Sequence, residues 1–182
     1  MSAPQTFSPA HLRRLRSQHA TSDEYGRHRH LYLHDMMRAL AADFAAAEGH
    51  RASLLDYGCG KGRFLEELRA LDVFGDIDGY DPAVGSFNTR PQTHYDFVTC
   101  CDVLDASERF VDAVIQDIAQ IAKHTAIFDC LTKPAPKSGF APHPPYYWIE
   151  RVAKQMQIVK TEMQFLGLAG HERAVIIAKP MA

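Results

Sequence analysis

The sequence lacks a long apolar segment and a strong charge of either sign. No apolar run among its 182 residues approaches the roughly 18–20 that a membrane-spanning helix needs. Its 20 basic and 22 acidic residues give a formal net charge of -2, so the chain has no large positive field for a nucleic-acid backbone. The N-terminus also lacks the apolar region of a secretory signal. The composition therefore argues against a membrane or a nucleic-acid partner.

The sequence has few cysteines and no paired-cysteine motif. The four cysteines stand in apolar segments without C-x-x-C spacing, at Cys59, Cys100, Cys101 and Cys130. We expect them to be reduced and buried, which excludes a disulfide or zinc framework and predicts a cytoplasmic protein. The length fits one domain with a sizeable core.

The first part of the chain is polar and has only a weak apolar pattern. Residues 1–34 are interpreted as a partly ordered N-terminal arm or lid, with Tyr25 and His34 as its site-facing residues. His28, His30 and His34 could be metal ligands, but no acid or cysteine stands at a fixed spacing from them. A solvated basic arm is favoured and no metal site is predicted. An RNA-contacting arm is the weaker alternative.

Helical and extended patterns alternate through residues 35–182. Apolar residues at helical spacing predict helices over residues 33–48, 64–71 and 110–121, and a later helix carrying Trp148, Ile149, Val152 and Met156 inward. Short apolar runs predict strands over residues 52–55, 77–80, 95–101, 125–131, 158–166 and 174–178. This order predicts a single α/β domain with a doubly wound, mostly parallel Rossmann-like sheet that ends in an antiparallel hairpin.

A glycine-rich turn follows the first predicted strand and precedes a helix. Gly58, Gly60 and Gly62 allow a tight turn and a close approach of a ligand to the backbone. Their spacing is neither the G-x-G-x-x-G of a dinucleotide-binding fold nor that of a phosphate-binding P-loop. Asp56, just before the turn, would repel a pyrophosphate but can attract an ammonium group.

A second acid, Asp81, ends the second predicted strand. At that position a carboxylate can accept both hydroxyls of a ribose. A ligand with an adenosine ribose and an amino-acid ammonium, and without phosphates, satisfies both Asp56 and Asp81. S-adenosylmethionine is such a molecule.

Three segments in order resemble motifs of the class I S-adenosylmethionine-dependent methyltransferases: LLDYGCGKG, GYDPA and YDFVTCCDVLD. DPAVGSF and the late His143 with Tyr147-Trp148 resemble, more narrowly, compact methyltransferase-domain proteins of bacterial and phage genomes. The resemblance implies that the glycine turn contacts the methionine part, that the second acid holds the ribose and that the end of YDFVTCC approaches the sulfonium. The implied cofactor-binding residues are Asp56, Gly58, Cys59, Gly60, Asp81, Pro82, Phe87, Cys101 and Asp102.

The chain departs from the family pattern at two places. Only Pro82–His94 separates the second strand from the next, so the family's third strand is expected to be short or missing, with Phe87 covering the adenine. Ala106 stands where the family usually has a histidine. Asp105, three residues before Glu108, is interpreted as the N-cap of the following helix.

Methyl transfer is an in-line displacement in which positioning supplies most of the catalysis, and a base matters only if the acceptor must lose a proton. The base candidates near the strand ends are Asp102, Asp129 and His143, of which His143 and Asp102 are the predicted catalytic residues. Tyr146, Tyr147 and Trp148 either line an acceptor pocket or pack the following helix.

The predicted function is transfer of a methyl group from S-adenosylmethionine to a small-molecule or glycan-like acceptor. A catalytically idle binding or regulatory module is the alternative. An NAD-dependent oxidoreductase is disfavoured by the glycine spacing and by the lack of a clear catalytic constellation.

Overall fold

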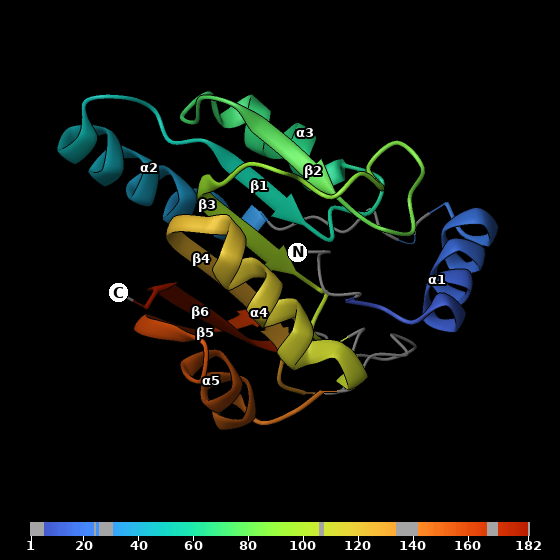
Figure 1. Ribbon diagram of the computed structural model, residues 1–182. Helices are drawn as coiled ribbons and strands as arrows, with labels where there is room; N and C mark the ends of the chain where they lie inside the picture. The colour runs from blue at the N-terminus through green and yellow to red at the C-terminus, as the bar shows by residue number, and fades with distance from the viewer. Residues whose placement is uncertain are drawn as a thin grey trace.

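The computed structural model describes residues 6–23, 25, 31–105, 108–133, 142–166 and 171–181 (Figure 1). Its helices and strands are, in chain order, α1 (Pro9–Thr21), the short 3-10 helix η1 (Leu31–Leu33), α2 (His34–Glu48), β1 (Leu54–Tyr57), α3 (Arg63–Leu71), β2 (Ile77–Tyr80), β3 (Tyr95–Cys101), the short 3-10 helix η2 (Glu108–Phe110), α4 (Val111–Ile121), β4 (Ala122–Leu131), α5 (Pro145–Ala153), β5 (Met156–Leu166) and β6 (His171–Pro180). His28, His30 and Ala106, which the sequence singled out, lie outside the described residues.

One six-stranded sheet in the order β2-β1-β3-β4-β6-β5 forms the centre of the molecule. The first four strands of that order are parallel, while β6 runs antiparallel to both β4 and β5. The predicted fold class is therefore confirmed. Residues 81–94, all described, contain no strand between β2 and β3, so the expected loss of the third strand is confirmed too. β2 becomes an edge of the sheet.

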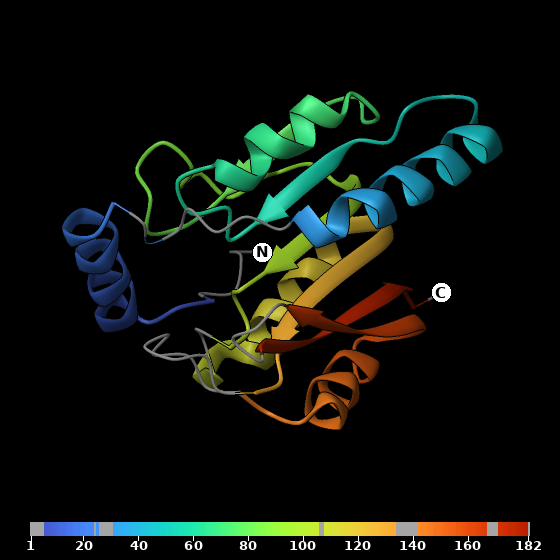
Figure 2. The same ribbon diagram turned by 180° about the vertical axis from the view of Figure 1, so that it is seen from behind.

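Helices cover both faces of the sheet (Figures 1 and 2). On one face, α2 and α3 bury Met37, Phe44 and Leu68 against strand residues such as Leu54. On the other face, α4 and α5 pack against strand residues that alternate with these, such as Leu55. Both faces of β1 and β3 are therefore largely apolar, as the apolar runs in their sequences indicate. Among the described helices, none has the length and apolar character to span a bilayer.

Three local predictions need correction. The first strand begins at Leu54 rather than residue 52, which places Asp56 inside the strand, opposite Gly79 and Thr99. α5 ends at Ala153, and the buried Met156 starts β5 instead of continuing the helix. A buried apolar residue four positions after Val152 fits a helix and an adjacent strand equally well, so the spacing misled the prediction.

The third correction concerns the arm, where a 13-residue helix, α1, occupies Pro9–Thr21. The Ser8 side chain accepts a hydrogen bond from the His11 N–H at 3.2 Å, and Pro9 stands in the first turn. A serine followed by proline is a helix-start signal that the sequence carried but the weak apolar pattern obscured.

The loop that replaces the third strand is fastened by a buried charge. Arg90 donates from Nε and Nη2 to Oδ1 of Asp117, at 3.0 and 2.6 Å. Asp117 lies fully buried in α4, and its Oδ2 accepts the hydroxyl of Tyr57 at 2.7 Å. Arg90 thus anchors the loop of residues 81–94 to helix α4.

We expect Arg90→Met to lower the free energy of unfolding by about 2 kcal/mol, because it leaves the carboxylate of Asp117 without its cation. The loss is set below that of a fully buried pair because the Arg90 side chain is 23% exposed. Urea denaturation measures it. Asp112→Asn, on the exposed side of α4, is the control. An unchanged denaturation midpoint in Arg90→Met would contradict a structural role for the Arg90–Asp117 pair.

Candidate active site

The glycine turn between β1 and α3 is held by the end of β2. The N–H groups of Gly58 and Cys59 both donate to the carbonyl oxygen of Tyr80, at 2.6 and 3.2 Å. Gly58 has a φ of +84°, and a Cβ built there would lie 2.1 Å from Cγ2 of Val103. Only glycine fits this close approach, so the turn packs directly against the segment that follows β3.

The acid that ends β2 meets the same turn. One carboxylate oxygen of Asp81 accepts the Gly60 N–H at 3.0 Å, and the other accepts the Ala83 N–H at 2.8 Å. The side chain is buried, and burial raises the pKa of Asp81 while these two N–H groups oppose the rise. Each oxygen retains a second lone pair, so Asp81 can still accept ligand hydroxyls.

Asp56 and Cys59 lie beneath the turn. Asp56 is buried inside β1, where it accepts the hydroxyl of Thr99 at 2.8 Å. Burial raises the pKa of Cys59, and the carboxylates of Asp56 and Asp81 raise it further. Cys59 therefore stays a neutral thiol, suited to packing beside a ligand rather than to nucleophilic attack.

The segment after Asp81 folds back over the start of α3. The N–H of Asp81 donates to the carbonyl oxygen of Phe87 at 2.9 Å. The half-buried Phe87 ring would lie 3.1 Å from a Cβ placed on Gly62. Phe87 and Pro82 therefore border the same turn as Asp81, while the predicted adenine contact stays a prediction.

Helix α1 lies across the carboxyl ends of the parallel strands (Figures 1 and 2). Arg16 donates to the carbonyl oxygen of Pro82 at 3.4 Å, and Lys61 donates to the carbonyl oxygen of Ser22 at 2.8 Å. His19 places Nε2 3.9 Å from Oδ2 of Asp81. The arm is thus docked on the turn and on its acid.

The two residues picked from the arm separate in the structure. The Tyr25 ring packs edge-on against His19, and its pKa is raised by burial and by the charges of Asp81, Asp105 and Asp102. His34 instead lies at the start of α2, 3.4 Å from Glu67 in α3. Only Tyr25 is placed close to the candidate site.

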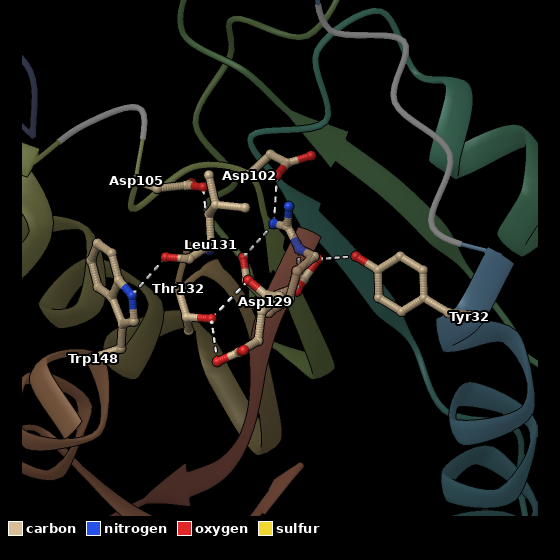
Figure 3. A network of polar contacts seen from close by, with 9 residues as sticks. Tyr32, Asp102, Asp105, Asp129, Leu131, Thr132 and Trp148 are labelled. Carbon is tan, nitrogen blue, oxygen red and sulfur yellow. Dashed lines mark hydrogen bonds and ion pairs between the residues drawn. The ribbon is translucent and has the colours of Figure 1, made fainter. Parts of the chain in front are cut away.

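A second polar cluster occupies the ends of β3 and β4 (Figure 3). Arg173 of β6 donates from Nε to Oδ1 of Asp129 at 2.7 Å and from Nη2 to Asp102. The hydroxyl of Tyr32 donates to the other oxygen of Asp129. Asp102 is therefore anchored by a guanidinium. Sequence reasoning missed Arg173, although an arginine directly before the apolar run AVIIA was a visible signal.

Asp105 is turned into this cluster. The side chain is 2% exposed, and its Oδ2 accepts the Leu131 N–H at 3.4 Å. Burial and the carboxylate of Asp102 raise the pKa of Asp105 to about 7, with Arg173 opposing the rise. The N-cap interpretation is wrong: α4 begins at Val111 without a side-chain cap, because Asp105 faces β4 instead.

The other predicted residues on this side belong to packed clusters. Cys101 is part of the core beneath α2 and α3, and burial raises its pKa. His143 stacks on Tyr147 with ring centroids 3.9 Å apart and meets Trp148 edge-on. Trp148 is fully buried and donates to the carbonyl oxygen of Leu131 at 3.1 Å, so it packs the helix. The same carbonyl accepts the His143 N–H.

The two halves of the site therefore meet at the carboxyl ends of β1–β4. One half joins the glycine turn, Asp81 and the docked arm, and the other joins Asp102, Asp105 and the Arg173 cluster. Within the described ranges, no group of three histidine, cysteine or acidic side chains is arranged to hold a metal ion.

A family profile described as a methyltransferase domain matches residues 25–156 of the sequence. The chain belongs to this methyltransferase family. The sequence resemblance to the class I S-adenosylmethionine-dependent methyltransferases is thereby confirmed, and the sheet order agrees with it.

Solved structures of methyltransferases share the fold. A 1,6-didemethyltoxoflavin-N1-methyltransferase from Burkholderia thailandensis, with its substrate and S-adenosylhomocysteine bound, has a TM-score of 0.68 at 15% identity, covering 100% of this chain and 94% of its own. A magnesium protoporphyrin IX methyltransferase from Synechocystis with bound S-adenosylhomocysteine has a TM-score of 0.67 at 15% identity, covering 93% and 99%. The N-methyltransferase NodS from Bradyrhizobium japonicum has a TM-score of 0.60 at 12% identity, covering 94% and 99%. No curated protein matches the sequence.

Proposed function

We propose that this methyltransferase moves a methyl group from S-adenosylmethionine to a small-molecule acceptor. The observation that carries the proposal is the junction of the glycine turn with Asp81, a buried carboxylate whose oxygens are oriented by the Gly60 and Ala83 N–H groups. The names of the structural neighbours add support, since they describe enzymes that act on toxoflavin precursors and porphyrins.

The residues present fit this cofactor. Asp81 would accept the ribose hydroxyls, the turn at Gly58–Gly60 would lie along the methionine part, and Pro82 and Phe87 would flank the adenine. Lys61, the basic residue within the turn, donates its ammonium to the Ser22 and Asp23 carbonyls of the arm instead of pointing at a phosphate site. The buried carboxylates of Asp56 and Asp81 are acceptors, and they suit a ligand with hydroxyls and an ammonium group better than a pyrophosphate.

When bound, the cofactor supplies an electrophilic methyl group on a sulfonium. The protein's own part is to orient and to exclude water. Asp81 and the glycine turn would hold the cofactor. The segment after β3, anchored through Asp102 and Arg173, would border the methyl acceptor. We also propose that residues 1–34 act as a lid, since α1 docks on Pro82 and Lys61, with residues 35–182 as the cofactor-binding domain. The four free, buried thiols support a cytoplasmic location.

Thermal unfolding with three ligands tests the cofactor. S-adenosylmethionine and S-adenosylhomocysteine at about 100 times their Kd should add roughly 2.7 kcal/mol and raise Tm by several degrees, whereas NAD should not. A shift with NAD alone, or with none of the three, overturns the proposal. Binding without methyl transfer to any acceptor supports the idle binding module instead.

Asp81→Asn tests the ribose contact. The amide keeps the size of the side chain and one acceptor but removes the charge and one acceptor oxygen, so we expect the Kd for S-adenosylhomocysteine to rise about 10–100-fold. Isothermal titration calorimetry measures the change, with Asp43→Asn on the exposed face of α2 as the matched control. An unchanged Kd in Asp81→Asn contradicts the assignment of Asp81 to the ribose.

A further inference from the structure

Three buried or half-buried carboxylates share one guanidinium at the ends of β3 and β4. Arg173 is bonded to Asp129 and to Asp102, while Oδ2 of Asp105, close to both, accepts the Leu131 N–H at 3.4 Å. Counted over these four groups alone, full ionisation gives two more negative charges than positive ones. In a water-poor site such an excess is costly unless a cation compensates it.

One atom of the cluster has no hydrogen-bond partner among the residues that the structure describes. Oδ1 of Asp105 is buried, and it makes no hydrogen bond among the described residues. Figure 3 shows the carboxyl group of Asp105 turned toward Leu131 and Asp102, on the inner side of the cluster. A buried acceptor oxygen without a donor is rare in proteins and calls for an explanation, such as a functional role or a bound group.

The position of the cluster connects it to methyl transfer. Tyr25, whose pKa responds to Asp81 as well as to Asp102 and Asp105, lies within electrostatic reach of both halves of the site. The ends of β1 and β3 are adjacent in the sheet, and Val103, between Cys101 and Asp105, contacts the glycine turn. The unpartnered oxygen therefore belongs to the acceptor side of the proposed cofactor site.

We propose that the methyl acceptor is an amine that enters as an ammonium ion, binds between Asp102 and Asp105, and loses its proton to Asp105. The proposal rests on the proposed methyltransferase function and names the chemical class of its acceptor. An ammonium group compensates the excess negative charge and supplies the donor that Oδ1 of Asp105 lacks.

The proton must leave because an ammonium nitrogen has no lone pair for the displacement. An N–H bond of the acceptor breaks, its electron pair stays on nitrogen, and the proton passes to the carboxylate of Asp105. The neutral nitrogen then forms a bond to the methyl carbon while the carbon–sulfur bond breaks, and that electron pair returns to sulfur. The products are a methylated ammonium ion, a neutral thioether and a protonated Asp105, which releases its proton to water when the product leaves.

The surroundings of Asp105 suit this exchange. Its pKa of about 7 lies much nearer to that of an amine than the ordinary value of an aspartate does. The groups that face it are Asp102 after β3, Cys100 in β3, Asp129 and Cys130 in β4, Arg173 in β6 and Tyr25 of the arm. Burial raises the pKa of both cysteines, so they stay neutral.

Binding of matched probes to the full-length protein saturated with S-adenosylhomocysteine tests the proposal. Calorimetry at pH 8.5 compares benzylammonium with benzyl alcohol, which has the same ring and a neutral donor, and with benzyltrimethylammonium, which is charged but has no N–H. We expect benzylammonium to bind at least tenfold more tightly than either, and Asp105→Asn to abolish this preference. Asp43→Asn, on the exposed face of α2, should leave it unchanged.

Titration near pH 7 in two buffers of different ionisation enthalpy adds a second readout. Benzylammonium binding should release protons from the wild-type protein, because it favours the ionised form of Asp105, and should release none from Asp105→Asn. A structural role for Asp105 alone would not produce this proton release.

The outcomes separate the two proposals. If S-adenosylhomocysteine binds but benzylammonium fails to bind, binds no better than benzyl alcohol, or keeps its preference in Asp105→Asn, the amine assignment is overturned and the proposed function stands. If the excess charge serves the sulfonium instead, Asp105→Asn will weaken S-adenosylmethionine binding at least tenfold more than S-adenosylhomocysteine binding, which also overturns it. Failure of the wild type to bind either cofactor overturns the proposed function.

Discussion

Replacing Arg173 by methionine should lower the free energy of unfolding by about 3–5 kcal/mol, one of the two largest effects we expect in this protein. Methionine fills much of the volume of the arginine stem but removes the guanidinium from between Asp129 and Asp102. Asp129 is fully buried, and a buried carboxylate that loses its cation costs several kcal/mol. Urea denaturation at pH 8 measures the loss.

A double-mutant cycle identifies the cause of the stability loss in Arg173→Met. Adding Asp129→Asn to Arg173→Met should restore a large part of the lost stability, since it removes the charge that the first substitution leaves unpaired. Arg151→Met is the matched control: Arg151 pairs with the exposed Asp112 at 2.7 Å, so its loss should be about 1 kcal/mol or less. Equal losses in the two arginine variants would assign the effect of Arg173 to packing rather than to charge.

Asp105→Asn should have the opposite effect and raise the free energy of unfolding at alkaline pH by about 2–4 kcal/mol. The folded state raises the pKa of Asp105 to about 7 from the ordinary aspartate value of 3.8, and each pKa unit corresponds to about 1.4 kcal/mol. A raised pKa means that the folded protein binds the proton more tightly than the unfolded chain. Ionisation of Asp105 therefore costs stability as pH rises from about 4 to 7, and the amide variant avoids that cost.

Unfolding free energies at pH 5, 7 and 9 test this sign. The stabilisation by Asp105→Asn should reach less than half of its full size at pH 5, be nearly complete at pH 7 and stay level to pH 9, because it grows only between the unfolded and the folded pKa. Asp43→Asn should show no such trend, because Asp43 is exposed in α2. A pH-independent difference would mean that Asp105 titrates near its ordinary value. A site residue that lowers stability is common where function requires a strained or charged group.

The sheet and the glycine turn show how much of the fold the sequence predicts. The strands over residues 77–80 and 95–101 have the predicted bounds. The dense apolar and aromatic run YDFVTCC specifies the buried strand β3 locally, while the shorter, partly exposed IDGY ends at the Asp-Pro turn. The glycine turn and Asp81 were also paired correctly, because their order along the chain puts both at the carboxyl ends of adjacent parallel strands. The predicted roles of these residues toward the cofactor still await the binding experiments above.

Asp105 shows where the same reasoning reaches its limit, while the catalytic role of His143 stays a prediction. The structure stacks the His143 ring on Tyr147 near the start of α5. Asp105 carried the spacing of a capping box, but its carboxyl group turns toward Leu131 in β4. A capping motif is a local signal, and a neighbouring strand with an unsatisfied N–H can override it.

By itself, the sequence determined the order of the elements after the arm, the sheet type and the loss of the third strand, because apolar periodicity and turn residues act over a few positions. Only the tertiary structure decided which charges meet. Antiparallel pairing sets Arg173 opposite Leu131, on the same face as Asp129 two residues earlier, while parallel pairing sets Asp129 beside Cys101, next to Asp102. Residues up to 71 positions apart become neighbours through strand register, which no local pattern encodes.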